Sequence, residues 1–125
     1  MTTFKLTKRM LEVGNAPYIA RANAKLAAEI RTSWPEPVAH LSDKQLVWMV
    51  GQARDAAVRF GVKDPMIRKR WITVHALLVP FFFTAPGVEQ LFANAFGNPD
   101  DKAADVLQQI KVQFCEEGFS AQIWW

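Results

Sequence analysis

The sequence predicts an all-α protein, a single-domain helical bundle of four to six helices. Three observations favour this class: apolar residues recur at helical spacing, cap-then-proline signals precede these periodic segments, and no stretch alternates as a β-strand does. The 125 residues suit one domain, and the 50% hydrophobic composition is enough to build a core. We therefore predict one domain over residues 1–125, with residues 119–125 as an apolar C-terminal tail.

The first long helix is expected to begin at Asn15, which suits an N-cap, with Pro17 in its first turn. Residues 4–14 would precede it as an approach segment, with a short helix over residues 7–13. Pro35 is expected to end the long helix, because a residue before proline is biased away from the α region. The apolar positions of this helix are Ile19, Ala22, Leu26, Ile30 and Trp34.

The second helix is predicted to open at Ser42, because Ser42 and Gln45 have the spacing of a capping box. Gly61 suits a left-handed stop at its other end. Its apolar stripe consists of Leu46, Met49 or Val50, Ala53, Ala57 and Phe60.

The third helix is predicted to start at Asp64 and Pro65 and to break at Pro80. It is apolar on several faces, which is typical of a central helix. Its main stripe is Ile67, Trp71, Val74 and Leu78, and we expect Trp71, Val74 and Leu78 to be buried.

Two further helices are expected after the turn cluster at residues 84–87. The first is short, turns Val88, Leu91 and Phe92 inward, and ends near Phe96. The last one starts at Asn98 and Pro99 and ends at Gly118. Its apolar stripe is Ala103, Leu107, Ile110 and Phe114.

Residues that could carry catalysis or bind a metal are scattered. The two histidines, His40 and His75, are far apart, and His75 suits a core position where its ring would bond a backbone carbonyl. The single cysteine, Cys115, precedes Glu116 and Glu117, whose charges would raise a thiol pKa. No nucleotide-binding or nucleophile motif occurs. We therefore expect no catalytic residue, no cofactor and no metal site.

Two pairs of adjacent carboxylates flank the last helix. Asp100 and Asp101 lie at its start, and Glu116 and Glu117 lie at its end. Solvated surface is the preferred interpretation of both pairs, and the first also suits the positive end of the helix dipole.

The charge is unevenly distributed. Residues 1–70 hold 13 Lys or Arg against 6 Asp or Glu, a balance of +7, whereas residues 71–125 hold 2 against 6, a balance of −4. The basic half either solvates the bundle or offers a face to an acidic partner. Arg68, Lys69 and Arg70 are the partner-binding candidates, although neighbouring helical side chains point about 100° apart. Nucleic acid is an unlikely ligand at a net charge of +3.

The tail holds Trp124 and Trp125, which are either folded back onto the bundle or exposed as anchors for a protein partner. The chain shows no secretory signal, and the apolar stretch of residues 71–83 is too short to span a bilayer. A cytoplasmic protein is therefore expected.

The order of these motifs resembles a family of small bacterial proteins encoded beside type VI secretion effectors. The resemblance covers about residues 5–96. It is most specific at Leu41, Ser42, Asp43 and Leu46, followed by Arg54, Ala57, Phe60, Gly61 and Val62. It also includes three other segments. These are Leu6 and Thr7 near the start of the chain, the end of the first long helix with Leu26, Ile30, Arg31, Trp34 and Pro35, and the residues Phe82, Thr84 and Pro86 that follow the third helix.

The sequence departs from this family at several positions. Phe60 replaces a usual Tyr, Val79 replaces a usual Gly, and Phe83 and Ala85 replace usual acidic residues. The resemblance implies a non-catalytic accessory protein that binds a secreted effector, either as an adaptor or chaperone or as an immunity protein. A nucleic-acid-binding regulatory module is the further alternative.

Overall fold

The computed structural model describes the backbone of residues 8–115 and the side chains of residues 18–114. This part of the chain is helical and holds no strand, which confirms the all-α prediction. It forms five α-helices and one short 3-10 turn, η1: α1 (Lys8–Ser33), α2 (Asp43–Phe60), α3 (Pro65–Leu77), η1 (Phe82–Thr84), α4 (Pro86–Ala93) and α5 (Pro99–Cys115).

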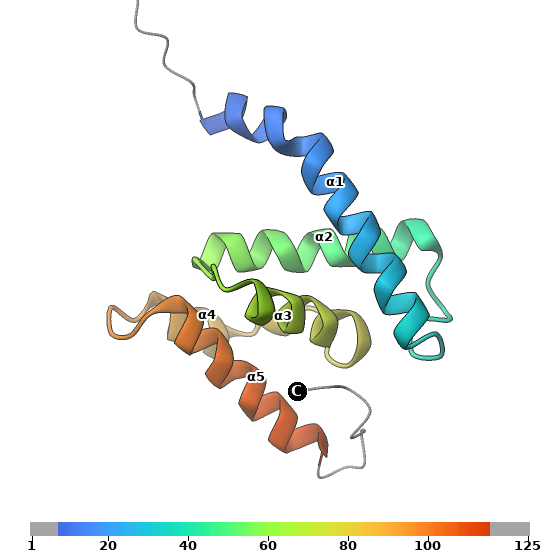
Figure 1. The fold of residues 1–125 in the computed structure, drawn as a ribbon. Coiled ribbons are helices and arrows are strands. Elements are labelled where there is room, and N and C mark those ends of the chain that lie inside the picture. The colour runs from blue at the N-terminus through green and yellow to red at the C-terminus, as the bar shows by residue number, and fades with distance from the viewer. Residues whose placement is uncertain (1–7, 116–125) are drawn as a thin grey trace, which may run out of the picture.

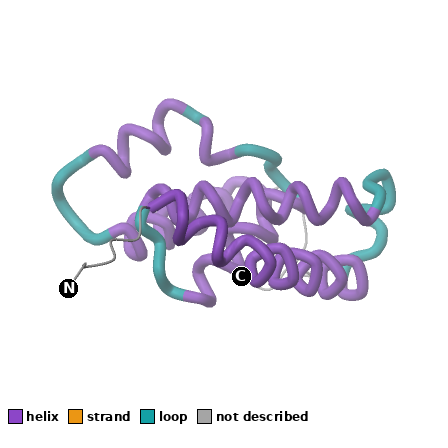
Figure 2. Tube along the Cα trace, turned by 90° about the horizontal axis from the view of Figure 1, so that it is seen from above, coloured by secondary structure: helices purple, strands orange, loops and turns teal. Residues whose placement is uncertain are grey.

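The central helices are α2 and α3. Helix α2 packs against both α1 and α3, and α3 packs against α5 (Figure 1). Short loops join the helices, as the view from above shows (Figure 2). None of the described helices combines the length and apolar character that crossing a membrane requires.

Helix α1 is longer than the sequence predicted, and the expected start at Asn15 is wrong. The helix is continuous from Lys8, so Asn15 and Pro17 lie inside it. An interior proline removes one backbone hydrogen bond and kinks a helix without having to end it. Figure 1 shows that the axis of α1 changes direction in its first half. The predicted end is confirmed, because the helix stops at Ser33 before Trp34 and Pro35.

Helix α2 begins and ends as predicted. The Ser42 N–H donates to Oε1 of Gln45 at 2.8 Å, and the Gln45 N–H donates to Oγ of Ser42 at 3.1 Å. These two bonds form the capping box. Gly61 ends the helix in the left-handed region, with φ of 85°. A Cβ there would also lie 3.2 Å from Cγ of Pro99, so the site suits glycine for two reasons.

Helix α3 is the buried centre of the protein. Oδ1 of Asp64 accepts hydrogen bonds from the N–H groups of Met66 and Ile67, which confirms the predicted cap. Trp71 and Val74 are fully buried, as expected. Leu78 is only partly buried, which corrects the prediction: the helix ends at Leu77, so Leu78 leaves the helical stripe.

An aromatic cluster closes the core around Trp71. Its ring lies 4.7 Å from that of Phe82 in an edge-on arrangement and is stacked 6.0 Å from that of Phe83. Phe60 stacks on Phe92 at 4.5 Å, which joins α2 to α4. Such contacts add to the hydrophobic burial of the rings.

Helix α4 ends at Ala93, three residues earlier than predicted. Asn94 adopts an extended conformation and its Oδ1 accepts a hydrogen bond from the Phe96 N–H, a local turn that competes with the helix. Phe96 is consequently 84% exposed. The inward side chains Val88, Leu91 and Phe92 pack partly buried against the core, as expected.

Helix α5 starts at the predicted cap, where Oδ1 of Asn98 accepts a hydrogen bond from the Asp101 N–H. Ala103 and Leu107 are buried, and Ile110 is partly buried against the core. The predicted stop at Gly118 and the pair Glu116 and Glu117 lie outside the described residues.

Candidate protein-binding groove

A groove of about 530 Å³ lies among α1, α2 and α3. Its volume falls in the range of ordinary ligand sites, about 300–1,000 Å³. It is lined by Tyr18, Arg21, Ala22, Lys25, Leu26 and Glu29 of α1, Arg54 of α2, Lys63 of the connecting loop, and Pro65, Arg68, Lys69 and Ile72 of α3.

The groove is strongly basic. Its lining holds six cationic side chains and a single acidic one, Glu29. Four of the cations are exposed at its rim (Arg21, Lys25, Lys63 and Lys69), whereas Arg54 and Arg68 are half-buried. We call the site formed by its twelve lining residues the basic groove.

The α1 wall follows from helical spacing. Arg21 and Lys25 lie four residues apart, so their side chains occupy the same face of the helix. Ala22 and Leu26 are one position further along and turn toward the bundle, where Leu26 is buried. The wall is therefore apolar on the side that faces the bundle and cationic on the side that faces solvent.

Arg54 is held in place by α1. Its Nε donates a hydrogen bond of 2.5 Å to Oδ1 of Asn23, which is only 8% exposed. Gly51 makes room for this contact, since a Cβ there would lie 3.2 Å from Nδ2 of Asn23. Burial lowers the pKa of Arg54 below its ordinary value, and the nearby charge of Arg68 lowers it further. A bound anion would oppose these shifts by favouring the charged form of Arg54.

Arg68 is held by the loop before its own helix. Its Nε donates a hydrogen bond of 2.5 Å to the carbonyl oxygen of Val62, which is fully buried. Both arginines thus use Nε in internal hydrogen bonds, and both side chains line the groove. Lys69 lies 3.7 Å from Glu29 in an exposed ion pair across the groove.

The structure separates the three basic residues that the sequence singled out. Arg68 and Lys69 line the basic groove. Arg70 instead lines a small hollow between α3 and α5, with Ile67, Leu107 and Lys111 among its neighbours. The other two partner-binding candidates, Trp124 and Trp125, lie outside the described residues.

Sequence reasoning missed four cations of the groove: Arg21, Lys25, Arg54 and Lys63. Only the spacing of Arg21 and Lys25 gave a local signal that two of them share a face. Which face of α1 meets α3 depends on packing, and that information is not local.

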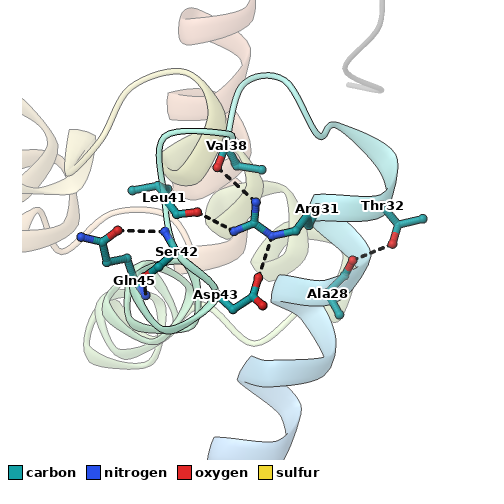
Figure 3. A network of polar contacts seen from close by, with 8 residues as sticks. All are labelled: Ala28, Arg31, Thr32, Val38, Leu41, Ser42, Asp43 and Gln45. Carbon is teal, nitrogen blue, oxygen red and sulfur yellow. Dashed lines mark hydrogen bonds and ion pairs between the residues drawn. The ribbon is translucent and has the colours of Figure 1, made fainter.

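A network around Arg31 fixes the corner between α1 and α2 (Figure 3). Its Nη2 donates to the carbonyl oxygen of Leu41 at 2.7 Å, and its Nη1 donates to that of Val38 at 3.4 Å. Its Nε forms an ion pair with Asp43 at 2.9 Å. Arg31 therefore ties the end of α1 to the start of α2.

Asp100 lies at the surface, as the sequence suggested, and it also has a structural role. Its Oδ1 accepts hydrogen bonds from the N–H groups of Lys63, at 2.8 Å, and Asp64, at 3.1 Å. The bonds from Asp64 and Lys63 hold the pKa of Asp100 below its ordinary value. The contact joins α5 to the loop that carries Lys63 into the groove.

His75 is a core residue, as expected, and it hydrogen-bonds the protein backbone. Nδ1 accepts from the Phe81 N–H at 2.7 Å, and this bond supports Phe81 in a left-handed conformation with φ of 58°. Burial lowers the pKa of His75 to about 4, and the backbone of Met49 opposes the shift.

Within the described residues, no three His, Cys, Asp or Glu side chains are grouped so that they would hold a metal ion. No protein-family model, curated protein or solved structure matches the chain.

Proposed function

We propose that the protein is a non-catalytic binding protein that holds an acidic segment of a partner protein in the basic groove. One observation supports this proposal above all others. Six cations from three helices and one loop converge on a groove whose lining contains a single acid. Like charges gathered at one site repel each other, and an acidic ligand offsets this repulsion. The positive charge of the groove also attracts such a ligand and speeds its association.

The fixed arginines also favour a specific ligand. Arg54 is held by Asn23 and Arg68 by Val62, so neither guanidinium has to be ordered when the ligand binds. Arginine donates paired hydrogen bonds to carboxylates, and preorganisation lowers the entropic cost of binding.

The resemblance to proteins encoded beside type VI secretion effectors supplies a biological setting for this proposal. We infer an effector adaptor or chaperone in the bacterial cytoplasm. An immunity protein is the alternative. A basic groove does not imitate nucleic acid, so it is poorly suited to block a nuclease toxin, whose cleft would itself be basic. Immunity would therefore be directed at a toxin with an acidic surface.

The test uses the product of the gene adjacent to that of this protein. Both proteins are co-purified, and the stoichiometry is measured by size-exclusion chromatography with light scattering. The proposal predicts a one-to-one complex that the double variant Lys25→Glu, Lys69→Glu disrupts. The control is Lys44→Glu, Arg59→Glu, which makes the same change in net charge at exposed positions of α2 outside the groove.

A complex that tolerates the groove variant as well as the control would contradict the proposed function. Co-expression then separates the two roles. An adaptor raises the solubility or export of the effector and leaves its toxicity intact, whereas an immunity protein abolishes toxicity without changing effector level or export.

Nucleic acid is the second candidate ligand, because a cluster of Lys and Arg also attracts phosphates. Salt-sensitive binding to arbitrary DNA, weakened by the groove variant and retained by the control, would favour this candidate.

A further inference from the structure

The single acidic side chain of the basic groove is already paired with one of its cations. Oε2 of Glu29, on α1, lies 3.7 Å from Nζ of Lys69, on α3. Helices α1 and α3 both pack on α2, so this ion pair joins the two walls of the groove directly. Among the side chains that the structure describes, Glu29 forms an ion pair with no other cation of the groove.

This ion pair is easily exchanged. The side chains of Glu29 and Lys69 are 47% and 57% exposed, and exposed ion pairs are screened by water and contribute little to stability. Arg54 and Arg68 differ, because their Nε atoms donate hydrogen bonds to partly buried or buried oxygen acceptors of the protein. Lys69 can therefore pass from one carboxylate to another at little cost to the fold, whereas the two arginines keep their internal partners.

Glu29 presents to Lys69 the same chemical group that an acidic ligand would present. It follows Lys25 by four residues and so lies on the groove face of α1. Two carboxylates beside one ammonium group repel each other. A ligand carboxylate that approaches Lys69 therefore gains most when Glu29 moves away.

We propose that Glu29 is an internal competitor for Lys69, which an acidic segment of the partner displaces when it binds. This inference rests on the proposed function. Displacement requires only a rotamer change of an exposed glutamate, so α1 does not have to move. Glu29 thereby lowers the affinity of the groove for every acidic ligand that uses Lys69, and the partner supplies the replacing carboxylate at this position.

The probe for the test is a fluorescein-labelled octaglutamate peptide, and its binding is measured by fluorescence anisotropy. Glu29→Gln keeps the shape of the side chain and removes its charge. We expect this variant to bind the peptide about twofold to fivefold more tightly than the parent protein, the range that exposed ion pairs support. Glu36→Gln makes the same replacement at an exposed position between α1 and α2, outside the groove, and should stay within about 1.5-fold.

Displacement is separated from a general effect of charge by repeating the replacement without Lys69. In a Lys69→Gln background there is no ion pair to displace, so Glu29→Gln should change the affinity by less than about 1.5-fold. Equal tightening with and without Lys69 would show that Glu29 acts only through the net charge of the groove and would overturn the internal competitor. An unchanged affinity of Glu29→Gln in the parent protein would overturn it as well.

Glu29→Asp provides a second variant, because it keeps the charge but shortens its reach toward Lys69. Displacement predicts tighter binding of the peptide to this variant too, whereas an effect of net charge alone predicts no change. Urea unfolding curves establish that each variant is folded.

The failure of the proposed function remains distinguishable. If the Lys25→Glu, Lys69→Glu variant loses the peptide but the replacements of Glu29 change nothing, only the internal competitor is wrong. If the peptide does not bind at millimolar concentration, or binds equally well to that groove variant, the groove is not an acid-binding site and the proposed function is wrong.

Discussion

The Nε atom of Arg54 donates a 2.5 Å hydrogen bond to Oδ1 of Asn23, and this bond joins α2 to α1 beside the basic groove, which Arg54 lines. The pair serves two purposes at once. It satisfies the buried Oδ1 of Asn23, and it holds Arg54, which lines the groove. The stability of the α1–α2 contact and the geometry of the candidate site therefore depend on the same bond.

Replacement of the amide tests this coupling. Asn23→Ala should lower the free energy of unfolding by about 1–3 kcal/mol, because it leaves a half-buried guanidinium without its partner. It should also weaken binding of the acidic partner, since Arg54 is no longer held. Urea denaturation measures the first effect. Thr32→Ala, which removes an exposed bond within α1, is the control and should cost under about 0.5 kcal/mol.

The indole of Trp71 is the largest fully buried side chain of the described core. Trp71→Ala should destabilise the protein by about 3–5 kcal/mol, because it removes the ring contacts with Phe82 and Phe83 and leaves a cavity. Trp48→Ala is the matched control, since Trp48 is 55% exposed and should lose about 1 kcal/mol or less. Similar losses at both tryptophans in chemical unfolding would contradict this description of the core.

His75 should make stability depend on pH between about 4 and 6.5. Its folded pKa is lowered to about 4, so the unfolded state binds the proton first as the pH falls below 6.5. The contribution of the neutral ring is fully present above pH 6.5 and is lost progressively down to about pH 4, a total of about 3 kcal/mol.

The measurement is urea denaturation at a series of pH values. His75→Asn keeps an acceptor near the Phe81 N–H but does not titrate, so it should remove most of this slope. An unchanged slope in the variant would assign the pH dependence to other groups. Asp100 acts below this window: its folded pKa is depressed, so its contribution is lost only as the pH falls through that value.

Lys69 and Arg70 are neighbours in sequence but lie on different sides of α3. Lys69→Glu should slow association with the acidic partner several-fold and reduce the salt dependence of the association rate. Arg70→Glu makes the same charge change outside the groove and should leave the rate within about twofold. Stopped-flow measurements at several ionic strengths compare the association rates of the two variants, and unfolding curves confirm that both variants are folded. Equal effects would show that the basic groove is not the contact surface.

Local signals in the sequence determined where most helices begin and end. The capping box of Ser42, the left-handed Gly61 and the cap-then-proline starts at residues 64–65 and 98–99 are confirmed, because each works through hydrogen bonds within a few residues. The interior of α1 is the exception. Asn15 and Pro17 are typical of a helix start, but an interior proline is also compatible with a kinked, continuous helix.

The sequence by itself determined an all-α chain, most of the apolar positions that form its core and a basic N-terminal half, since these follow from composition and helical spacing. The tertiary structure alone decided which cations meet. Arg21 and Lys25 of α1, Arg54 of α2 and Arg68 of α3 are distant along the chain, and they share a groove because α1 and α3 both pack on α2. A helix turns each residue by about 100°, so Arg70 faces elsewhere although it lies beside Lys69.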